Sequence, residues 1–169
     1  FSESIINSNK AIEGYEKLGY HRYIPYSLGN IGIAYDSLSR LDLAEKYYLE
    51  AIEQHKIHQN DYEVSYISKN LVYLYVRLDQ FDKAIEYADQ AIHLAQKISA
   101  KEMLKDAYLA KSTLSLRQGN YEQAYVYQKK HKVLNDSLFE QSKVNAIFEL
   151  QTKYKTQEKE AEIIKKSNT

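Results

Sequence analysis

The stretch LGNIGIAYDSLSRLDLAEKYYLEAI, residues 28–52, contains two groups of apolar residues that recur at intervals of three and four. Leu28 and Ile31 belong to the first group, and Ala44 and Tyr48 belong to the second. This spacing places apolar side chains on one face of an α-helix. The stretch therefore predicts two amphipathic helices that follow one another closely.

The same pattern returns forty residues later as KNLVYLYVRLDQFDKAIEYADQAI, residues 69–92. Four sets of positions fall in register at this spacing. The sets are Phe1, Leu41, Phe81 and Tyr121; Ser4, Ala44, Ala84 and Ala124; Ala11, Ala51, Ala91 and His131; and Ile12, Ile52, Ile92 and Lys132. A fixed spacing of this size indicates a repeat architecture in which each unit is a pair of helices.

Short polar or glycine-containing pairs separate the two helices of each unit, as a tight antiparallel connection requires. These pairs are Ser39-Arg40, Asp79-Gln80 and Gly119-Asn120. A small residue near the start of each second helix allows the two helix backbones to approach to about 8–9 Å. The small residues are Ala44, Ala84 and Ala124.

The composition favours an all-helical fold. One proline and five glycines in 169 residues are few of the breakers that a β fold needs. The sequence contains no run of about eighteen apolar residues, which a membrane-spanning helix would need. Basic and acidic residues number 23 each, so no large basic field is available for nucleic acid. Cysteine is absent, which excludes disulfides and thiolate chemistry and leaves the redox compartment open.

The units resemble tetratricopeptide repeats (TPRs), whose pattern joins a Leu-Gly pair, a tyrosine, and an alanine and an aromatic in the second helix. In the first unit, the pattern is carried by Ile31-Gly32, Tyr35, Ala44, Tyr48 and Ala51. The resemblance implies an all-α fold: an antiparallel helix-pair solenoid, or TPR-like right-handed superhelix, with a long C-terminal helix.

The sequence departs from this family pattern in several places. Its spacing of forty exceeds the common 34, and the usual final proline is missing. Val72 stands where the second unit would have a glycine. The third unit keeps little beyond Ala124, with Lys111, Ser112 and Ser115 in its first helix. Such decay is expected of a terminal repeat.

The register predicts five segments. They are 1–19, the second helix of a truncated TPR; 20–59, a TPR; 60–99, a TPR; 100–136, a degenerate TPR; and 137–169, a capping or signalling helix. Within them, the expected helices cover 1–18, 21–39, 42–58, 61–79, 82–98, 101–118 and 121–135. Asp136 and Ser137, with Glu140 as a capping box, predict the start of a last helix that runs to Lys166.

The resemblance also implies a binding groove on the concave face, lined by first-helix residues that are not used in packing. By register, the expected groove residues are Tyr26, Asn30, Ile33, Tyr66, Lys69, Asn70, Tyr73, Arg77 and Arg117, with Gly29, Asp36, Asp106, Leu109 and Thr113 at neighbouring groove positions. In related arrays an asparagine at the position of Asn30 and Asn70 grips the backbone of a bound peptide. An alternative is that both amides bond the neighbouring helix. The three cations favour a peptide with an acidic group.

No catalytic residue, cofactor or metal is predicted. His55 and His58 lie three residues apart near Asp61, a spacing that can bind zinc, but polar surroundings and the lack of a supporting shell argue against it. Phosphate-binding glycine loops and nucleophile motifs are absent from the linear sequence. We therefore expect a non-enzymatic binding module.

After Ser137 the forty-residue pattern stops and a new apolar stripe begins, which could cap the third repeat. The stripe consists of Leu138, Val144, Ile147, Phe148, Leu150 and Tyr154. With Ile147 and Tyr154 as heptad a positions and Leu150 as d, the residues Gln157, Ala161 and Ile164 extend a coiled-coil seam. This seam predicts a homodimer, and a solvated helix is the alternative.

The tail also resembles the region that follows TPR arrays in Bacteroidetes sensor histidine kinases and helix-turn-helix transcriptional regulators. The matching residues are Asp136, Ser137, Leu138, Phe139, Leu150, Gln151, Lys153 and Tyr154. The resemblance implies a sensory module that binds a peptide or protein and signals through the last helix, without touching nucleic acid itself. A stand-alone scaffold or adaptor is the alternative.

Phe1 is not a start methionine, which suggests a processed or excised piece of a longer protein. Membrane attachment would then come only through flanking segments. If the parent is a membrane-anchored sensor, the resemblance implies a location on the periplasmic side of the inner membrane. Otherwise the module would be cytoplasmic.

Overall fold

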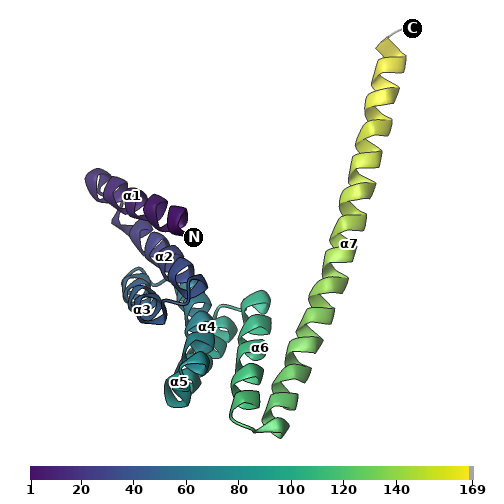
Figure 1. Cartoon of the computed structure of the whole chain (residues 1–169). Helices are drawn as coiled ribbons and strands as arrows, with labels where there is room; N and C mark the ends of the chain where they lie inside the picture. The colour runs from purple at the N-terminus through teal and green to yellow at the C-terminus, as the bar shows by residue number, and fades with distance from the viewer. Residues whose placement is uncertain (168–169) are drawn as a thin grey trace. The chain divides into compact units, whose positions relative to one another are not determined.

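The structure is a computed structural model that describes residues 1–167, and of the side chains beyond Glu160 only that of Ile163. Within these residues the chain is all-α, with one short 3-10 turn and no strand. The helices are α1 (Ser2–Leu18), α2 (Ile24–Ser37), α3 (Leu41–Ile57), α4 (Asp61–Arg77), α5 (Phe81–Lys97), α6 (Lys101–Arg117) and α7 (Tyr121–Ser167), with η1 (His21–Tyr23) before α2. The predicted helix-pair solenoid with a long C-terminal helix is confirmed (Figure 1).

The chain divides into two units, Phe1–Lys132 and a second unit that begins at Val133 inside α7. In the first unit each helix packs against the next, and α4 also packs directly against α6. The second helices lie between the first helices of successive repeats, because α3 packs against both α2 and α4, and α5 packs against both α4 and α6. We call α2, α4 and α6 the A helices, and α3 and α5 the B helices.

Every helix from α1 to α6 is followed by one residue in the left-handed region, and these residues are spaced at intervals of twenty. They are Gly19, Ser39, Gln59, Asp79, Ser99 and Gly119, with φ between 53° and 74°. The next backbone N–H then donates to the carbonyl five residues back, as from Arg40 to Tyr35 at 2.9 Å. This arrangement gives carbonyl groups of the last helical turn a hydrogen-bond donor, and it reverses the direction of the chain. Four of the six positions hold this conformation without glycine.

The buried faces of the repeats fit small residues against large ones. An added Cβ on Gly32 would lie 2.6 Å from Cδ1 of Tyr48, whose side chain is fully buried. Gly32 is therefore required so that α2 can approach the tyrosine ring closely. At the equivalent positions of the second repeat, Val72 and Ala88 are both buried, so the larger residue is on the A helix.

The buried polar side chains of α6, the first helix of the third repeat, have hydrogen-bond or ion-pair partners on the neighbouring helices. The Lys111 ammonium lies 2.6 Å from Oδ1 of Asp89, and Ser112 donates to the carbonyl of Ala124 at 2.8 Å. Ser115 hydrogen-bonds the side chain of Gln123 at 3.1 Å. These contacts hold α6 in the core with less apolar surface than α4 has.

Two predicted helix boundaries are wrong. The helix expected over 21–39 begins as an α-helix only at Ile24, after η1, because Pro25 suits the first turn of a helix and cannot donate a backbone hydrogen bond within it. The expected break at Asp136 and Ser137 does not occur, since α7 continues through both residues. No glycine or proline follows Gly119, so nothing in the backbone forces the helix to stop.

The second unit is a single stretch of helix with exposed apolar side chains. These are Val133, Phe139, Val144, Ile147, Phe148, Leu150, Tyr154 and Ile163. The predicted seam positions Ala161 and Ile164 lie outside the described side chains. None of the described helices combines the length and apolar character needed to cross a bilayer.

Candidate functional site

Four of the predicted groove residues line one cavity of about 170 Å³ between α2 and α4. Its walls come from both A helices, and one residue of α3 completes them. The lining residues are Pro25, Tyr26, Gly29, Asn30, Ile33, His55, Glu63, Tyr66 and Ile67. We call this the α2–α4 cavity. Its volume suits a single amino-acid side chain, and its lining mixes aromatic, aliphatic and polar groups.

Tyr26 is held in place at the edge of the cavity. Asn60 Nδ2 donates to the Tyr26 hydroxyl at 2.8 Å, while Asn60 Oδ1 caps α4 by accepting from the Glu63 N–H at 3.3 Å. The Tyr26 ring lies edge-on to the imidazole of His55, with centroids 4.8 Å apart. The Tyr26 residue as a whole is 41% exposed, so its orientation is fixed while part of its surface remains accessible to solvent.

His55 is the most deeply buried polar group of the cavity, at 1% exposure. Burial, aided by His58, lowers the pKa of the imidazole to about 4, so the ring is neutral at pH 7. Neither ring nitrogen has a hydrogen-bond partner among the described residues. Buried polar atoms are normally paired, so an unpaired imidazole beside a cavity stands out among the buried groups.

Glu63 contributes a half-buried carboxyl group at the first turn of α4. Burial raises its pKa, and no nearby cation counteracts that rise. The charge of this carboxylate is therefore not balanced by any neighbour that the structure describes.

The three predicted groove cations are each paired with an aspartate of a neighbouring repeat. Lys69 Nζ lies 3.9 Å from Asp106 Oδ2, Arg77 pairs with Asp36, and Arg117 Nη2 donates to Asp79 Oδ1 at 3.1 Å. Two of the aspartates were themselves placed in the groove by register. These ion pairs link successive repeats. They also offset the positive charge that suggested an acidic ligand.

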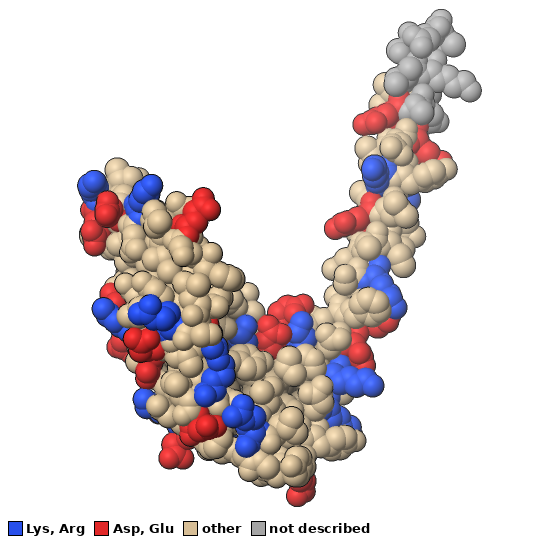
Figure 2. All heavy atoms as spheres, viewed as in Figure 1, with Lys and Arg blue, Asp and Glu red and all other residues tan. Residues whose placement is uncertain are grey.

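Positive and negative side chains are also interspersed across the visible face of the first unit (Figure 2). The structure therefore gives little support to the predicted preference for an acidic peptide, because the local cations already have partners.

The two asparagines lie at equivalent positions of α2 and α4. Asn30 is exposed and Asn70 is half-buried. Asn30 also lines the α2–α4 cavity. Tyr73 is half-buried, and burial raises the pKa of its hydroxyl. The role of these three residues in a groove stays a prediction.

Sequence reasoning missed His55 and Glu63 as parts of the site. His55 was weighed only as a zinc ligand, although it follows Ala51 and Ile52 on the apolar face of its helix. A comparison at the forty-residue spacing would have singled it out, because Ala95 occupies the equivalent position. Among the described residues, no group of three or more acidic, histidine or cysteine side chains could hold a metal ion.

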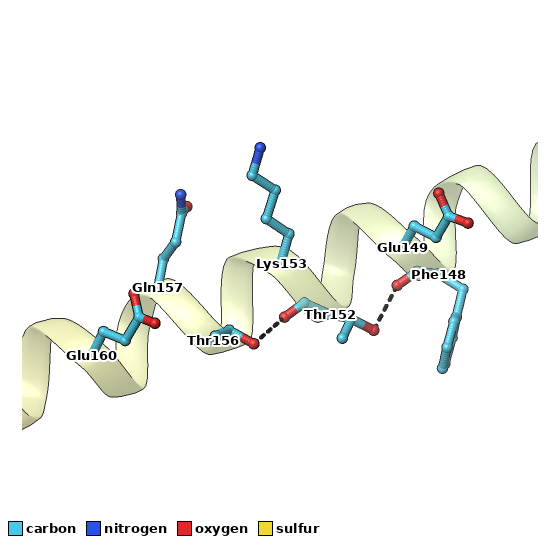
Figure 3. A pocket seen from close by; sticks show the side chains of 7 residues that line it. All are labelled: Phe148, Glu149, Thr152, Lys153, Thr156, Gln157 and Glu160. Atoms are coloured by element: carbon cyan, nitrogen blue, oxygen red, sulfur yellow. Dashed lines mark hydrogen bonds between the residues drawn. The ribbon is translucent and has the colours of Figure 1, made fainter.

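Two other hollows are open surfaces rather than cavities. One, of about 630 Å³, lies between α1 and α2 and includes Asn30 among its lining residues. The other, of about 510 Å³, is walled by α7 alone, between Phe148 and Glu160. Figure 3 shows that its threonine hydroxyls turn back to their own helix, with Thr152 donating to the Phe148 carbonyl at 2.9 Å and Thr156 to the Thr152 carbonyl at 3.0 Å.

The helix pairs can now be compared with known proteins. Residues 25–54 and 70–98 match the family model of the tetratricopeptide repeat. These two segments are therefore similar to tetratricopeptide repeats. Proteins with such repeats generally bind peptides or proteins and are generally not catalytic. The first matched segment holds the α2 side of the cavity, and the second holds Asn70, Tyr73 and Arg77.

A crystal structure with a similar fold is that of BtubC (BKLC) from P. vanneervenii, at a TM-score of 0.70 and 17% sequence identity. The similarity covers 79% of this chain and 56% of that chain, so this chain spans little more than half of its length. At this identity the likeness concerns the fold alone. Among curated proteins, none matches the sequence.

Proposed function

We propose that the repeats bind a peptide or protein segment along the exposed surface of the A helices. The observation that carries this proposal is the α2–α4 cavity, because Tyr26, Asn30, Ile33 and Tyr66 were selected by register and line one hollow. The amides of Asn30 and Asn70 would grip the ligand backbone, since each offers a donor and an acceptor and the two lie at equivalent positions of α2 and α4.

A selection from a random peptide library, followed by affinity measurement on the isolated chain, tests this proposal. The double variant Asn30→Ala with Asn70→Ala should lose at least about tenfold in affinity, which corresponds to ~1.4 kcal/mol. Helicity by circular dichroism should be unchanged. Asn135→Ala, an exposed asparagine on α7, is the matched control. Equal affinity for the double variant and the control would refute the groove assignment.

The finer proposal is a sensory module of a signal-transduction or transcriptional regulator, in which α7 carries the output. It is supported by the continuity of α7, whose first turn contributes the buried Ala124 and which then runs without a break to Ser167. A scaffold or adaptor for protein assembly is equally compatible with the repeats.

Sequencing the coding DNA on both sides of this segment separates the two functions. A downstream kinase or helix-turn-helix domain would favour the regulator, with a membrane helix before it if the module is periplasmic. A stop codon directly after the segment would favour the adaptor.

We also propose that the second unit forms a homodimer. Ile147, Leu150 and Tyr154 are exposed at positions that fit a heptad seam, and an isolated helix of this kind is stabilised by a partner. Light scattering should give a mass that rises with concentration, and Ile147→Glu with Leu150→Glu should restore the monomer. A monomer mass at every concentration would contradict the dimer.

A further inference from the structure

The position equivalent to the α2–α4 cavity one repeat later, between α4 and α6, is occupied by the side chain of a lysine. A shift of forty residues relates Gly29 to Lys69 and Tyr26 to Tyr66. The Lys69 ammonium lies 4.3 Å from the centroid of the Tyr66 ring and 3.9 Å from Asp106 Oδ2. Its side chain is only 15% exposed. The second position therefore holds a cation between an aromatic ring and a carboxylate.

The first position is open because it lacks this side chain. Gly29 has no Cβ, and a Cβ built on it would meet only Cδ1 of Ile67, at an ordinary contact distance of 3.6 Å. Ile33 is also smaller than its equivalent, Tyr73. The cavity of the first repeat thus occupies the space that the side chains of Lys69 and Tyr73 fill in the second repeat.

The polar groups around the cavity can accept hydrogen bonds or positive charge. Glu63 offers a carboxylate without a cationic partner, and the Tyr26 ring offers the same kind of face that Tyr66 presents to Lys69. His55 is buried, neutral and unpaired, so one of its nitrogens is an available acceptor and it adds no repelling charge. The lining residues include no lysine or arginine, and the groove cation Lys69 is paired with Asp106.

We propose that the α2–α4 cavity binds the side chain of a lysine or arginine from a bound peptide, with its cation between the Glu63 carboxylate and the Tyr26 ring. The ligand cation would take the place that Lys69 has in the second repeat, but the carboxylate comes from a different position, because Asp106 corresponds to Tyr66 and Glu63 corresponds to Met103. This inference deepens the proposed function and rests on it, since it names the residue type that the peptide surface selects. It replaces the acidic preference that the three paired cations had suggested.

Chemical-shift titration of the ¹⁵N-labelled chain with single-residue probes tests the inference without any selected peptide. The probes are Nα-acetyl-lysinamide, Nα-acetyl-argininamide and Nα-acetyl-norleucinamide, the last being a lysine analogue without the ammonium. We expect the basic probes to shift Tyr26, Glu63 and Tyr66 and to bind about tenfold tighter than norleucinamide. Glu63→Gln should remove this difference, and Glu50→Gln, an exposed carboxylate on α3, should keep it.

A second pair of variants fills the cavity from within. Gly29→Lys places a lysine where the second repeat has Lys69, so it should abolish the shifts caused by lysinamide. Gly29→Ala adds only a methyl group with room to spare and should leave them intact. Thermal unfolding and circular dichroism of each variant establish that it is folded before it is titrated.

Each outcome is decisive. Norleucinamide binding as tightly as lysinamide would identify an apolar pocket and overturn the inference, as would an unchanged preference in Glu63→Gln or no shift at the cavity residues. Library peptides that bind through Asn30 and Asn70 but lack basic residues would refute this inference and leave the proposed function standing. Lysinamide binding to a chain that selects no peptide would refute the proposed function and with it a peptide as the source of the bound side chain, and would leave only a site for basic groups.

Discussion

The first and second repeats solve the same packing problem in opposite ways. In the first, Gly32 on the A helix faces the large ring of Tyr48 on the B helix. In the second, the equivalent residues are Val72 and Ala88, and all the buried residues of α5 are alanines. The pair, rather than either residue, is what the architecture preserves. The valine that departs from the family pattern is therefore compensated by a small partner.

The same comparison explains where the cavity lies. α3 carries His55 where α5 carries Ala95, and the A helix carries Gly29 where the next carries Lys69. The first repeat has larger, partly polar residues on its B helix and smaller ones on its A helix. The A-helix surface of the first repeat consequently contains the α2–α4 cavity, whereas the equivalent space in the second repeat holds the Lys69 side chain.

The largest expected effect comes from breaking the Gly32 and Tyr48 pair. Tyr48→Ala should lower the free energy of unfolding by about 3–5 kcal/mol through the cavity it leaves. Gly32→Val should lower it by about 1–3 kcal/mol, because the valine overlaps a ring that has no room to move. Urea unfolding monitored by circular dichroism measures both.

The double variant sharpens this test, because it writes the second repeat's combination into the first. Gly32→Val with Tyr48→Ala should cost at least about 1 kcal/mol less than the sum of the single changes, since each removes the clash or void made by the other. Strict additivity would mean that the two positions do not compensate, and the comparison between the repeats would fail.

A smaller effect is expected from His55, whose equivalent in the second repeat is an alanine. The imidazole has a pKa of about 4 in the folded chain and about 6.5 when unfolded. Between these values the unfolded state binds more protons, so the free energy of unfolding falls as the pH falls from 6.5 to 4. The loss attributable to His55 should approach about 3 kcal/mol at pH 4.

His55→Ala should remove this part of the pH dependence, and His93→Ala, an exposed histidine on α5, should leave it in place. Glu63 acts in the opposite sense, because its raised pKa makes the folded state bind protons more readily in the same range. The difference between the His55 variant and the wild type therefore isolates the imidazole. Parallel stability curves for the two would contradict a buried neutral ring.

The smallest effect concerns the helix ends. Gln59 has φ of 53° and Gly119 has φ of 74°, so equivalent turns differ only in the residue that adopts the left-handed conformation. Gln59→Gly should raise the free energy of unfolding by about 0.5–1 kcal/mol, and Gly119→Ala should lower it by about 1 kcal/mol. Changes in melting temperature of opposite sign would establish this, whereas equal signs would contradict it.

Much of the fold could be predicted because it is periodic. The forty-residue register located six helices and the turns between them, since local pattern and tertiary packing agree there. The false helix start at Ser137 arose from a capping box, whose residues also tolerate a helix interior when nothing interrupts the backbone.

The candidate site was predicted in part. Register selected Tyr26, Asn30, Ile33 and Tyr66 as groove residues, and all four line one cavity, because they lie on successive A helices. It could not supply His55, which reaches the cavity from the end of a B helix, nor the pairing of Arg77 with Asp36 across two repeats. Those contacts depend on how neighbouring helices are rotated and offset, and a one-dimensional pattern does not contain that information.

The left-handed residues at intervals of twenty also define points at which whole repeats could be removed or inserted. Because Ser39 and Asp79 end their helices with the same backbone geometry, residues 40–79 could be excised and the two ends rejoined without a new kind of turn. The same cut could receive an additional forty-residue unit. The length of the A-helix surface is therefore set by the number of forty-residue units, and protein engineering could change it by one unit at a time.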